Sequence, residues 1–198
     1  AFTNYFKNRK NDYMKEKKVS IILPCYNAEK WVKEAVESAL NQTYENIEVI
    51  AVDNESTDST MGILEDIQKT SSKLIISSAK NIYPYCWDEA REEGLSLSSG
   101  EYLTTLCSDD FFEKDYIKSC VKCPVTSPTV FYKRELYDEG LIKTDPEKYS
   151  GAADYDLYCN LADRGLYILP VPHWIGYNYR WHSEQATWNM HNNKIDYN

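Results

Sequence analysis

The stretch Val19-Ser-Ile-Ile-Leu23 is a short apolar run rich in β-branched residues, and Pro24 follows it directly. Such a run is typical of a strand that is buried on both faces of a parallel sheet. Because proline cannot donate a ladder hydrogen bond, we expect this strand to end at Leu23. Apolar residues at helical spacing follow between residues 28 and 42. The two patterns together predict a strand followed by a helix.

The alternation of strand and helix continues along the first 122 residues. Further strands are predicted at residues 47–52, 74–76 and 102–106, with helices after residues 56–58 and between residues 87 and 98. After residue 122 the pattern is looser, and it predicts strands at 129–132 and 167–179 around a helix at 155–162. Strands separated by helices indicate parallel βαβ units. We therefore predict a single-domain α/β fold with a Rossmann-like, mostly parallel central sheet flanked by helices.

Composition limits the classes of protein to consider. The chain has 198 residues, of which 42% are hydrophobic and 27% charged, as in an ordinary globular domain. No apolar run approaches the ~20 residues of a membrane-spanning helix. A net charge of −9 argues against a nucleic-acid partner. Six cysteines lie scattered among the predicted elements, which favours reduced thiols in a cytoplasmic protein; Cys120-x-x-Cys123 lacks the second pair of a zinc site.

The charge is unevenly distributed. The first 18 residues carry six basic and two acidic side chains, although the chain as a whole is acidic. Aromatic residues lie between these charges, so this N-terminal arm, residues 1–17, could make a peripheral contact with an anionic membrane surface. We favour the simpler interpretation, a soluble leader packed on the outside of the domain.

Polar residues follow three of the four predicted N-terminal strands at the point where each strand ends. They are Tyr26-Asn27, Asp53 and Asp109-Asp110. Ligands of open α/β sheets bind beyond the carboxyl ends of the strands. An acid at one strand end is often only a turn or a helix cap, but acids at two such ends predict a site. Gly-rich phosphate loops and a G-x-S-x-G elbow are absent from the sequence, which argues against dehydrogenase, P-loop and serine-hydrolase chemistry.

Eight short segments occur in the order found in one enzyme family. They are 19–27 (VSIILPCYN), 53–58 (DNESTD), 90–95 (AREEGL), 100–102 (GEY), 108–110 (SDD), 128–130 (PTV), 153–157 (ADYDL) and 179–182 (YRWH). Over residues 18–183 the chain thus resembles the family 2 glycosyltransferases of the GT-A fold. The resemblance implies an enzyme that moves a sugar from a nucleoside-diphosphate sugar to an acceptor hydroxyl with inversion. It also implies a donor-binding half (18–122), an acceptor and catalytic-base half (123–183) and a tail (184–198).

The resemblance implies a metal-assisted reaction. A divalent cation held by carboxylates, Mn²⁺ or Mg²⁺, neutralises charge that builds on the leaving nucleoside diphosphate. Asp110 is implied as the main metal ligand, and Asp109 as a ligand or a contact to the donor ribose. His182 is implied as a further contact to the metal or diphosphate. A packed, hydrogen-bonded histidine is an equally good interpretation of His182.

Further roles follow from the same resemblance. Residues implied in binding the donor nucleotide are Pro24, Tyr26, Glu29, Asp53, Glu55 and Arg91. A guanidinium suits a diphosphate, although Arg91 could instead be a solvated charge paired with Asp88 or Glu92. Asp154 aligns with the acid that takes the proton from the acceptor hydroxyl. Its alternative role is a helix N-cap.

Cys107 and Ala153 stand where many family members have acids. A non-catalytic module that binds nucleotide sugars therefore stays open. A nucleotidyltransferase stays open as well, because such enzymes also place paired acids and a metal at the strand ends of a related sheet. Such an enzyme normally has a Gly-rich basic loop after the first strand, where this chain has Cys25-Tyr-Asn-Ala28. The expected acceptor is a glycan or a lipid-linked saccharide, and the domain could be part of a larger chain. The short interval from Asp110 to Ser127 is compatible with a minimal enzyme or with residues missing near Lys122–Cys123.

Overall fold

The computed structural model describes residues 17–82, 88–118, 132–143, 153–166, 177–180 and 182, with residues 153–156 described by their backbone alone. Most of the predicted N-terminal arm, the junction at Lys122–Cys123 and the predicted tail lie outside the described residues. So do most of the strands predicted at 129–132 and 167–179.

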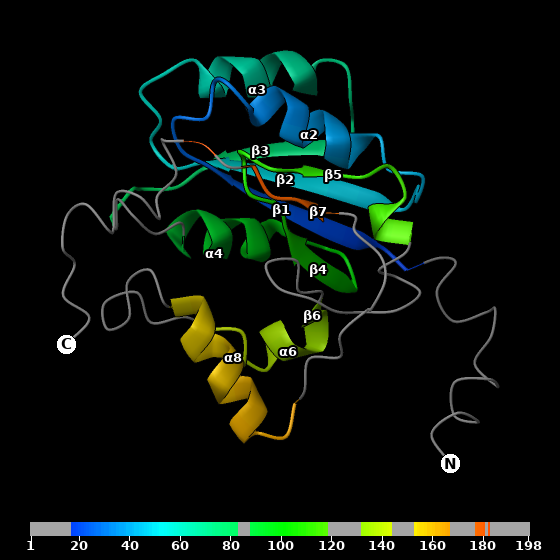
Figure 1. Ribbon diagram of the computed structural model, residues 1–198, viewed down its shortest axis with the longest axis vertical. Helices are drawn as coiled ribbons and strands as arrows, with labels where there is room; N and C mark the ends of the chain where they lie inside the picture. The colour runs from blue at the N-terminus through cyan, green and yellow to red at the C-terminus, as the bar shows by residue number, and fades with distance from the viewer. Residues whose placement is uncertain are drawn as a thin grey trace.

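A mostly parallel sheet forms the centre of the described fold (Figure 1). Its order is β3-β2-β1-β4-β6, with strands β1 (Val19–Cys25), β2 (Ile47–Asp53), β3 (Leu74–Ser78), β4 (Tyr102–Thr105) and β6 (Tyr132–Lys133). The first four are parallel, and β6 is antiparallel to β4. This confirms the predicted α/β class. Strand β6 overlaps the end of the strand predicted at 129–132, but its antiparallel direction was not predicted.

Strand β1 runs through Pro24 to Cys25, so the predicted end at Leu23 is wrong. The carbonyl of Ile22 accepts a hydrogen bond from the amide of Leu106, on the side of β1 that faces β4. Pro24, two residues on, faces the same side, because groups alternate along a strand. The pairing of β1 with β4 ends at Ile22 and Thr105. The missing N–H of Pro24 therefore costs the sheet no ladder hydrogen bond.

Helices cover both faces of the sheet (Figure 1). Helices α2 (Val32–Leu40) and α3 (Thr60–Gln68) lie on one face, and α4 (Asp88–Leu97) lies on the other. Alternate side chains of β1 pack on opposite faces of the sheet. Ile21 belongs to the core with α2 and α3, and Ile22 belongs to the core with α4. Burial of such a side chain contributes ~1.5–3 kcal/mol.

Helix α2 starts at Val32, four residues later than predicted. Residues 28–31 form a turn in which the amides of Trp31 and Val32 both donate to the carbonyl of Ala28. The amide of Ala28 in turn donates to Oγ1 of Thr60, 2.8 Å away. These contacts fix the entry of the chain into α2 next to the start of α3.

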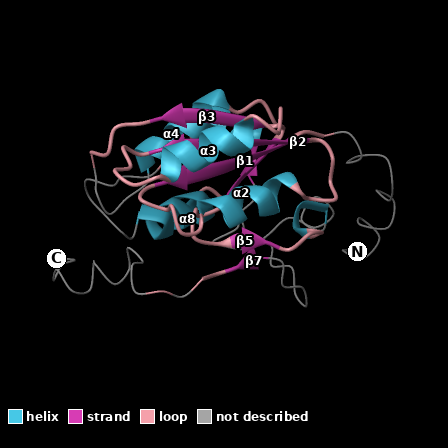
Figure 2. Ribbon diagram, turned by 90° about the horizontal axis from the view of Figure 1, so that it is seen from above, coloured by secondary structure: helices cyan, strands magenta, loops and turns pink. Residues whose placement is uncertain are grey.

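A second, two-stranded sheet joins distant parts of the chain (Figure 2). Strand β5 (Phe111–Phe112) pairs antiparallel with β7 (Tyr177–Asn178). This pairing brings residues 177–180 and 182 next to the end of β4. Helices α6 (Arg134–Asp138) and α8 (Ala153–Asp163) share a separate small core, to which Ile142, Leu157 and Leu161 belong. Among the described residues, no helix has the length and apolar character that crossing a membrane would require.

Candidate active site at the carboxyl edge of the sheet

The loops after β1 and β2 form one hydrogen-bonded rim. The amide of Asn27 donates to Oγ of Ser56, and the amide of Thr57 donates to Oδ1 of Asn27, at 2.9 and 2.8 Å. Asn27 has a φ of +46°, a left-handed conformation that asparagine tolerates better than most residues. The rim therefore holds the ends of two neighbouring strands in a fixed relation.

Asp53 ends β2 inside this rim. Its Oδ2 atom accepts a hydrogen bond from the amide of Ser56 at 3.1 Å. Its Oδ1 atom is buried and has no hydrogen-bond partner among the described residues. A buried carboxylate oxygen without a donor is costly, so this atom is suited to accept a hydrogen bond from a ligand. Next to it along the rim, Pro24 is buried in β1, and Tyr26 is 45% exposed.

The two glutamates predicted to bind the donor both make contacts within the fold. Oε2 of Glu29 accepts a hydrogen bond from the amide of Ser59, the N-cap residue of α3. Oε2 of Glu55 accepts one from the amide of Asn81 at 3.1 Å. Both side chains therefore fix the loops that surround Asp53.

Arg91 is only 4% exposed on α4, so it is not a solvated charge, but the pairing with Asp88 and Glu92 considered as its alternative is present. Its guanidinium Nη1 lies 3.3 Å from Oε1 of Glu92 and 3.7 Å from Oδ1 of Asp88. The Nη2 atom is buried and has no hydrogen-bond partner among the described residues. A buried donor of this kind can bind a phosphate or a nucleotide carbonyl.

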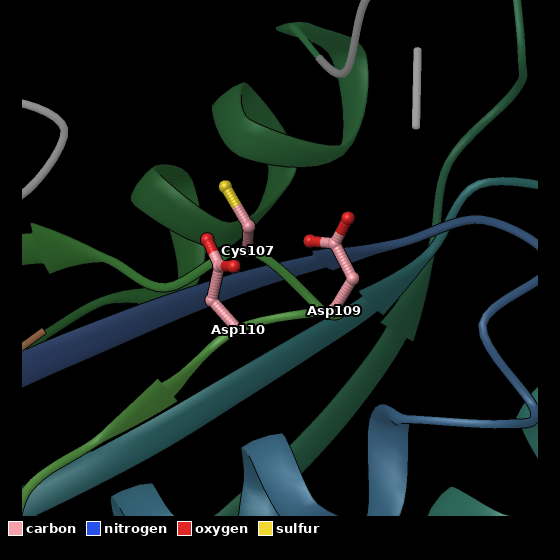
Figure 3. Close-up of side chains that lie close together, drawn as sticks. All are labelled: Cys107, Asp109 and Asp110. Atoms are coloured by element: carbon pink, nitrogen blue, oxygen red, sulfur yellow. The ribbon is translucent and has the colours of Figure 1, made fainter. Parts of the chain in front are cut away.

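A cluster of possible metal ligands follows β4 (Figure 3). Ligand atoms of Cys107, Asp109 and Asp110 all lie within 4.8 Å of one another. Two ligands of one ion are separated by at most about 4.4 Å, the sum of two metal–ligand bonds. Separations of up to 4.8 Å are close to this limit. The donor set thus fits a divalent cation.

The two aspartates of the cluster differ in burial and in their hydrogen bonds. Asp110 is 1% exposed, and both of its oxygens accept hydrogen bonds: Oδ2 from the hydroxyl of Tyr177 at 2.5 Å and Oδ1 from the amide of Arg180 at 2.6 Å. Burial raises the pKa of Asp110 to about 6, although the two hydrogen bonds act against that rise. The side chain of Asp109 is a quarter exposed. Asp110 is thus a buried anchor for β7, and Asp109 faces the open side of the cluster.

Residues 177–180 and 182 lie next to the cluster. Nε2 of His182 lies 2.9 Å from Oδ2 of Asp109, and the imidazole packs on Trp31 with ring centroids 4.0 Å apart. Nε of Arg180 donates to the carbonyl of Asp109 at 2.7 Å, and the same guanidinium pairs with Glu34 on α2. Charge, packing and backbone contacts together hold this segment over the end of β4.

The structure therefore brings Asp109, Asp110 and His182 together, as their sequence context indicated. Asp154 lies in the first turn of α8, and its side chain is outside the described residues, so its role stays a prediction. The sequence reasoning missed the contacts that Tyr177 and Arg180 make with Asp110. The segment 179–182 was recognised as a motif, but only His182 was selected from it.

Comparison with known proteins identifies the family. The family model described as "Glycosyl transferase family 2" matches residues 20–148. WfaP of Escherichia coli, a UDP-Glc:α-D-GlcNAc-diphosphoundecaprenol β-1,3-glucosyltransferase, is 35% identical over 150 residues, which cover 73% of this chain and 57% of WfaP. Glycosyltransferase GlyA of Streptococcus pneumoniae is 32% identical over 105 residues, 53% of this chain and 15% of GlyA. The chain thus spans only part of the length of these relatives.

A solved structure shows the same fold. The mannosyltransferase PcManGT from Pyrobaculum calidifontis, determined in complex with GDP-Man and Mn²⁺, superposes with a TM-score of 0.69. The alignment covers 88% of this chain and 63% of PcManGT at 19% identity. This likeness confirms the predicted GT-A architecture, and the family match covers more than half of the chain. The chain belongs to glycosyl transferase family 2.

Proposed function

We propose that this domain transfers a sugar from a nucleoside-diphosphate sugar to a hydroxyl group of a glycan or lipid-linked saccharide, with inversion at the anomeric carbon. The observation that carries the proposal is the group of Cys107, Asp109 and Asp110 at the carboxyl edge of a family 2 domain, with His182 2.9 Å from Asp109. WfaP, which is named for transfer to a diphosphoundecaprenol-linked saccharide, supports a lipid-linked acceptor.

In this proposal, the donor nucleotide binds at the rim formed by the loops after β1 and β2, next to Arg91 on α4. Oδ1 of Asp53 would accept a hydrogen bond from the base or ribose, and Nη2 of Arg91 would donate one to the base or diphosphate; both atoms are buried without a partner among the described residues. Tyr26, which follows β1 and is 45% exposed, could add an aromatic contact to the donor. Glu29 and Glu55 fix the loops around Asp53.

Asp109 and His182 are the residues we expect to hold a divalent cation such as Mn²⁺ or Mg²⁺. When bound, such an ion supplies positive charge that stabilises the leaving nucleoside diphosphate. Asp110 supports these ligands: it fixes the backbone of Arg180, two residues before His182. This assignment moves the main ligand role from Asp110, as the resemblance implied, to its neighbour.

Asp154 is the proposed general base. Its carboxylate would remove the proton from the acceptor hydroxyl as that oxygen attacks the anomeric carbon. The nucleoside diphosphate leaves from the opposite face, which inverts the configuration. Asp154 lies beyond residue 148, where the match to the family model ends, so this role rests on the local motif 153–157.

Thermal denaturation in the presence of UDP- and GDP-sugars, with and without Mn²⁺, tests donor binding. A ligand at 100 times its Kd stabilises the native state by ~2.7 kcal/mol. Transfer of a labelled sugar from the best donor then tests catalysis, and NMR of the product tests inversion. Donor binding without turnover on any glycan or lipid-linked acceptor would indicate a non-catalytic module. Pyrophosphate release from a nucleoside triphosphate and a sugar phosphate would indicate a nucleotidyltransferase.

A further inference from the structure

The loop that follows β3 is held beside Asp53. The amide of Ala79, the first residue after the strand, donates to the carbonyl of Asp53 at 2.9 Å. Two residues later, the amide of Asn81 donates to Oε2 of Glu55 at 3.1 Å. Because Glu55 itself follows Asp53 by two residues, these contacts fix Asn81 against the loop after β2.

The same loop also contacts the helix that carries Arg91. The amide of Ile82, the neighbour of Asn81, donates to Oε1 of Glu89 at 3.1 Å, and Glu89 lies in the first turn of α4. Arg91 follows two residues later on that helix. Residues 81 and 82 therefore join the segment that carries Asp53 to the segment that carries Arg91.

Each of these three segments has a buried side-chain atom without a hydrogen-bond partner among the described residues. The atoms are Oδ1 of Asp53, Oδ1 of Asn81 and Nη2 of Arg91. A buried polar atom without a partner costs free energy, so such atoms are uncommon in folded proteins. Their occurrence on three segments that hydrogen bonds hold together indicates a surface that a polar ligand completes. Asp53 and Arg91 already have a proposed role there, and Asn81 has none.

We propose that Oδ1 of Asn81 accepts a hydrogen bond from the nucleoside of the sugar donor, next to Asp53. The inference rests on the proposed function, because it concerns the donor substrate of the same reaction. Amide and carboxylate oxygens accept hydrogen bonds, and a guanidinium donates them. A nucleoside offers the complementary groups: ribose hydroxyls and a base N–H can donate to Asn81 and Asp53, and a base carbonyl can accept from Arg91.

This role predicts a particular effect on the free protein. Oδ1 of Asn81 has no partner among the described residues, and the hydrogen bond from Asn81 to Glu55 comes from the backbone amide, which a substitution retains. Asn81→Leu replaces the buried oxygen by an apolar group of similar size. The midpoint of urea denaturation should therefore stay the same or rise, although nucleotide binding becomes weaker.

Isothermal titration calorimetry with UDP and with GDP, at one fixed Mn²⁺ concentration, tests the proposal. The nucleotide that the parent binds more tightly should bind Asn81→Leu ~10-fold more weakly, equal to about 1.4 kcal/mol. Asn81→Ala should show a similar loss. Pyrophosphate lacks the nucleoside, so any affinity for it should be the same in the parent and in both variants.

Deoxy nucleotides identify the group that donates to Asn81. If a ribose hydroxyl is the donor, the 2′-deoxy or the 3′-deoxy form of the nucleotide should bind the parent and Asn81→Leu equally well. If the base N–H is the donor, the ~10-fold difference should persist with both deoxy forms. Either result supports a contact between Asn81 and the nucleoside.

Asn54 provides the matched control for stability. It is a buried asparagine directly after β2, and its side-chain nitrogen, in the orientation that its neighbours favour, donates to the carbonyls of Lys80 at 2.9 Å and Ala79 at 3.3 Å. Asn54→Ala removes both hydrogen bonds. Its urea midpoint should therefore fall, whereas that of Asn81→Ala should fall much less.

The outcomes separate this inference from the proposed function. Equal nucleotide affinity in the parent and Asn81→Leu would overturn the role of Asn81 and leave the transferase proposal intact. A urea midpoint that falls in both Asn81 variants as far as in Asn54→Ala would overturn it as well, because the side chain would then be structural. Failure of the parent to bind UDP, GDP or their sugars would overturn both proposals.

Discussion

Nε2 of His182 lies 2.9 Å from Oδ2 of Asp109, which joins two residues 73 positions apart in the sequence. Asp109 follows β4, and His182 follows β7. The contact exists because β7 pairs with β5. Arg180 supports it: its amide donates to Oδ1 of Asp110, and its Nε donates to the carbonyl of Asp109. Strand β7 and the residues that follow it, Arg180 and His182, are therefore part of the site.

The first prediction concerns Asp109. Asp109→Asn should lower sugar transfer on the order of 100-fold or more, about 2.7 kcal/mol of activation free energy, because the amide is a poor ligand for the cation. The side chain is partly exposed, so the free energy of unfolding should change by less than about 1 kcal/mol. Initial rates at saturating donor and urea denaturation measure the two effects. Transfer at the parental rate would contradict the assigned role.

The second prediction concerns Asp110, whose substitution should lower the stability of the fold, in contrast to that of Asp109. Asp110→Ala leaves the hydroxyl of Tyr177 and the amide of Arg180 without their acceptor in a buried place. We expect a loss of about 2–4 kcal/mol in the free energy of unfolding, measured by urea denaturation. A stable Asp110→Ala protein that loses only metal binding would instead support Asp110 as the main ligand.

The contrast between these neighbours shows what the sequence could and could not predict. Buried strands and the acids at their ends follow local patterns, so the parallel sheet and the position of the site were predictable. Which of Asp109 and Asp110 faces the ligand depends on Tyr177 and Arg180, about 70 residues later, and no local periodicity encodes that contact.

Strand β1 offers a second example. Pro24 is a strand breaker by local rules, yet β1 continues to Cys25. The reason is the length of the neighbouring strand. Strand β4 ends at Thr105, opposite Ile22, so β4 offers no partner for a backbone N–H at position 24, and the proline there loses no hydrogen bond. Only the register between β1 and β4 contains this information, and register is a tertiary property.

A prediction on packing concerns Gly100, which lies against the start of β1. A Cβ atom there would be 2.6 Å from the backbone nitrogen of Ser20 and 2.8 Å from the carbonyl oxygen of Lys18. Because backbone atoms cannot move aside easily, Gly100→Ala should lower the free energy of unfolding by at least about 2 kcal/mol. The midpoint of urea denaturation measures the change.

Gly62 provides the matched control for this substitution. It lies within α3, and a Cβ atom there would meet nothing within 4 Å. Gly62→Ala should therefore raise the stability by ~0.5–1 kcal/mol, because alanine favours the helix. Equal destabilisation by both substitutions would mean that loss of glycine itself, and not the close approach at Gly100, is responsible.

The last prediction concerns the dependence of stability on pH, far from the cluster. Glu48 is buried in β2, at the opposite edge of the sheet from Asp53. It forms an ion pair with Lys18, and its Oε1 accepts hydrogen bonds from Oγ of Ser20 at 2.5 Å and the amide of Ser99 at 2.6 Å. Burial alone would raise the pKa of Glu48, but these hydrogen bonds outweigh it and lower the pKa below the ordinary 4.5.

A carboxyl group whose pKa is lower in the folded state stabilises the fold above its unfolded-state pKa, and that stability is lost as the pH falls through the folded-state pKa. Glu48→Gln should cost about 1–3 kcal/mol near pH 7, because it weakens the hydrogen bonds that the buried carboxylate accepts from Ser20 and Ser99, while Lys18 is partly exposed and keeps a hydrogen bond to Ser99. The difference between the parent and Glu48→Gln should shrink as the pH falls below about 4.5. Glu101→Gln, which removes an exposed pair with Lys17, should cost at most about 1 kcal/mol. Urea denaturation from pH 7 to pH 3 measures all three proteins, and a constant gap between the parent and Glu48→Gln over this range would show that the ionised form of Glu48 is not what stabilises the fold.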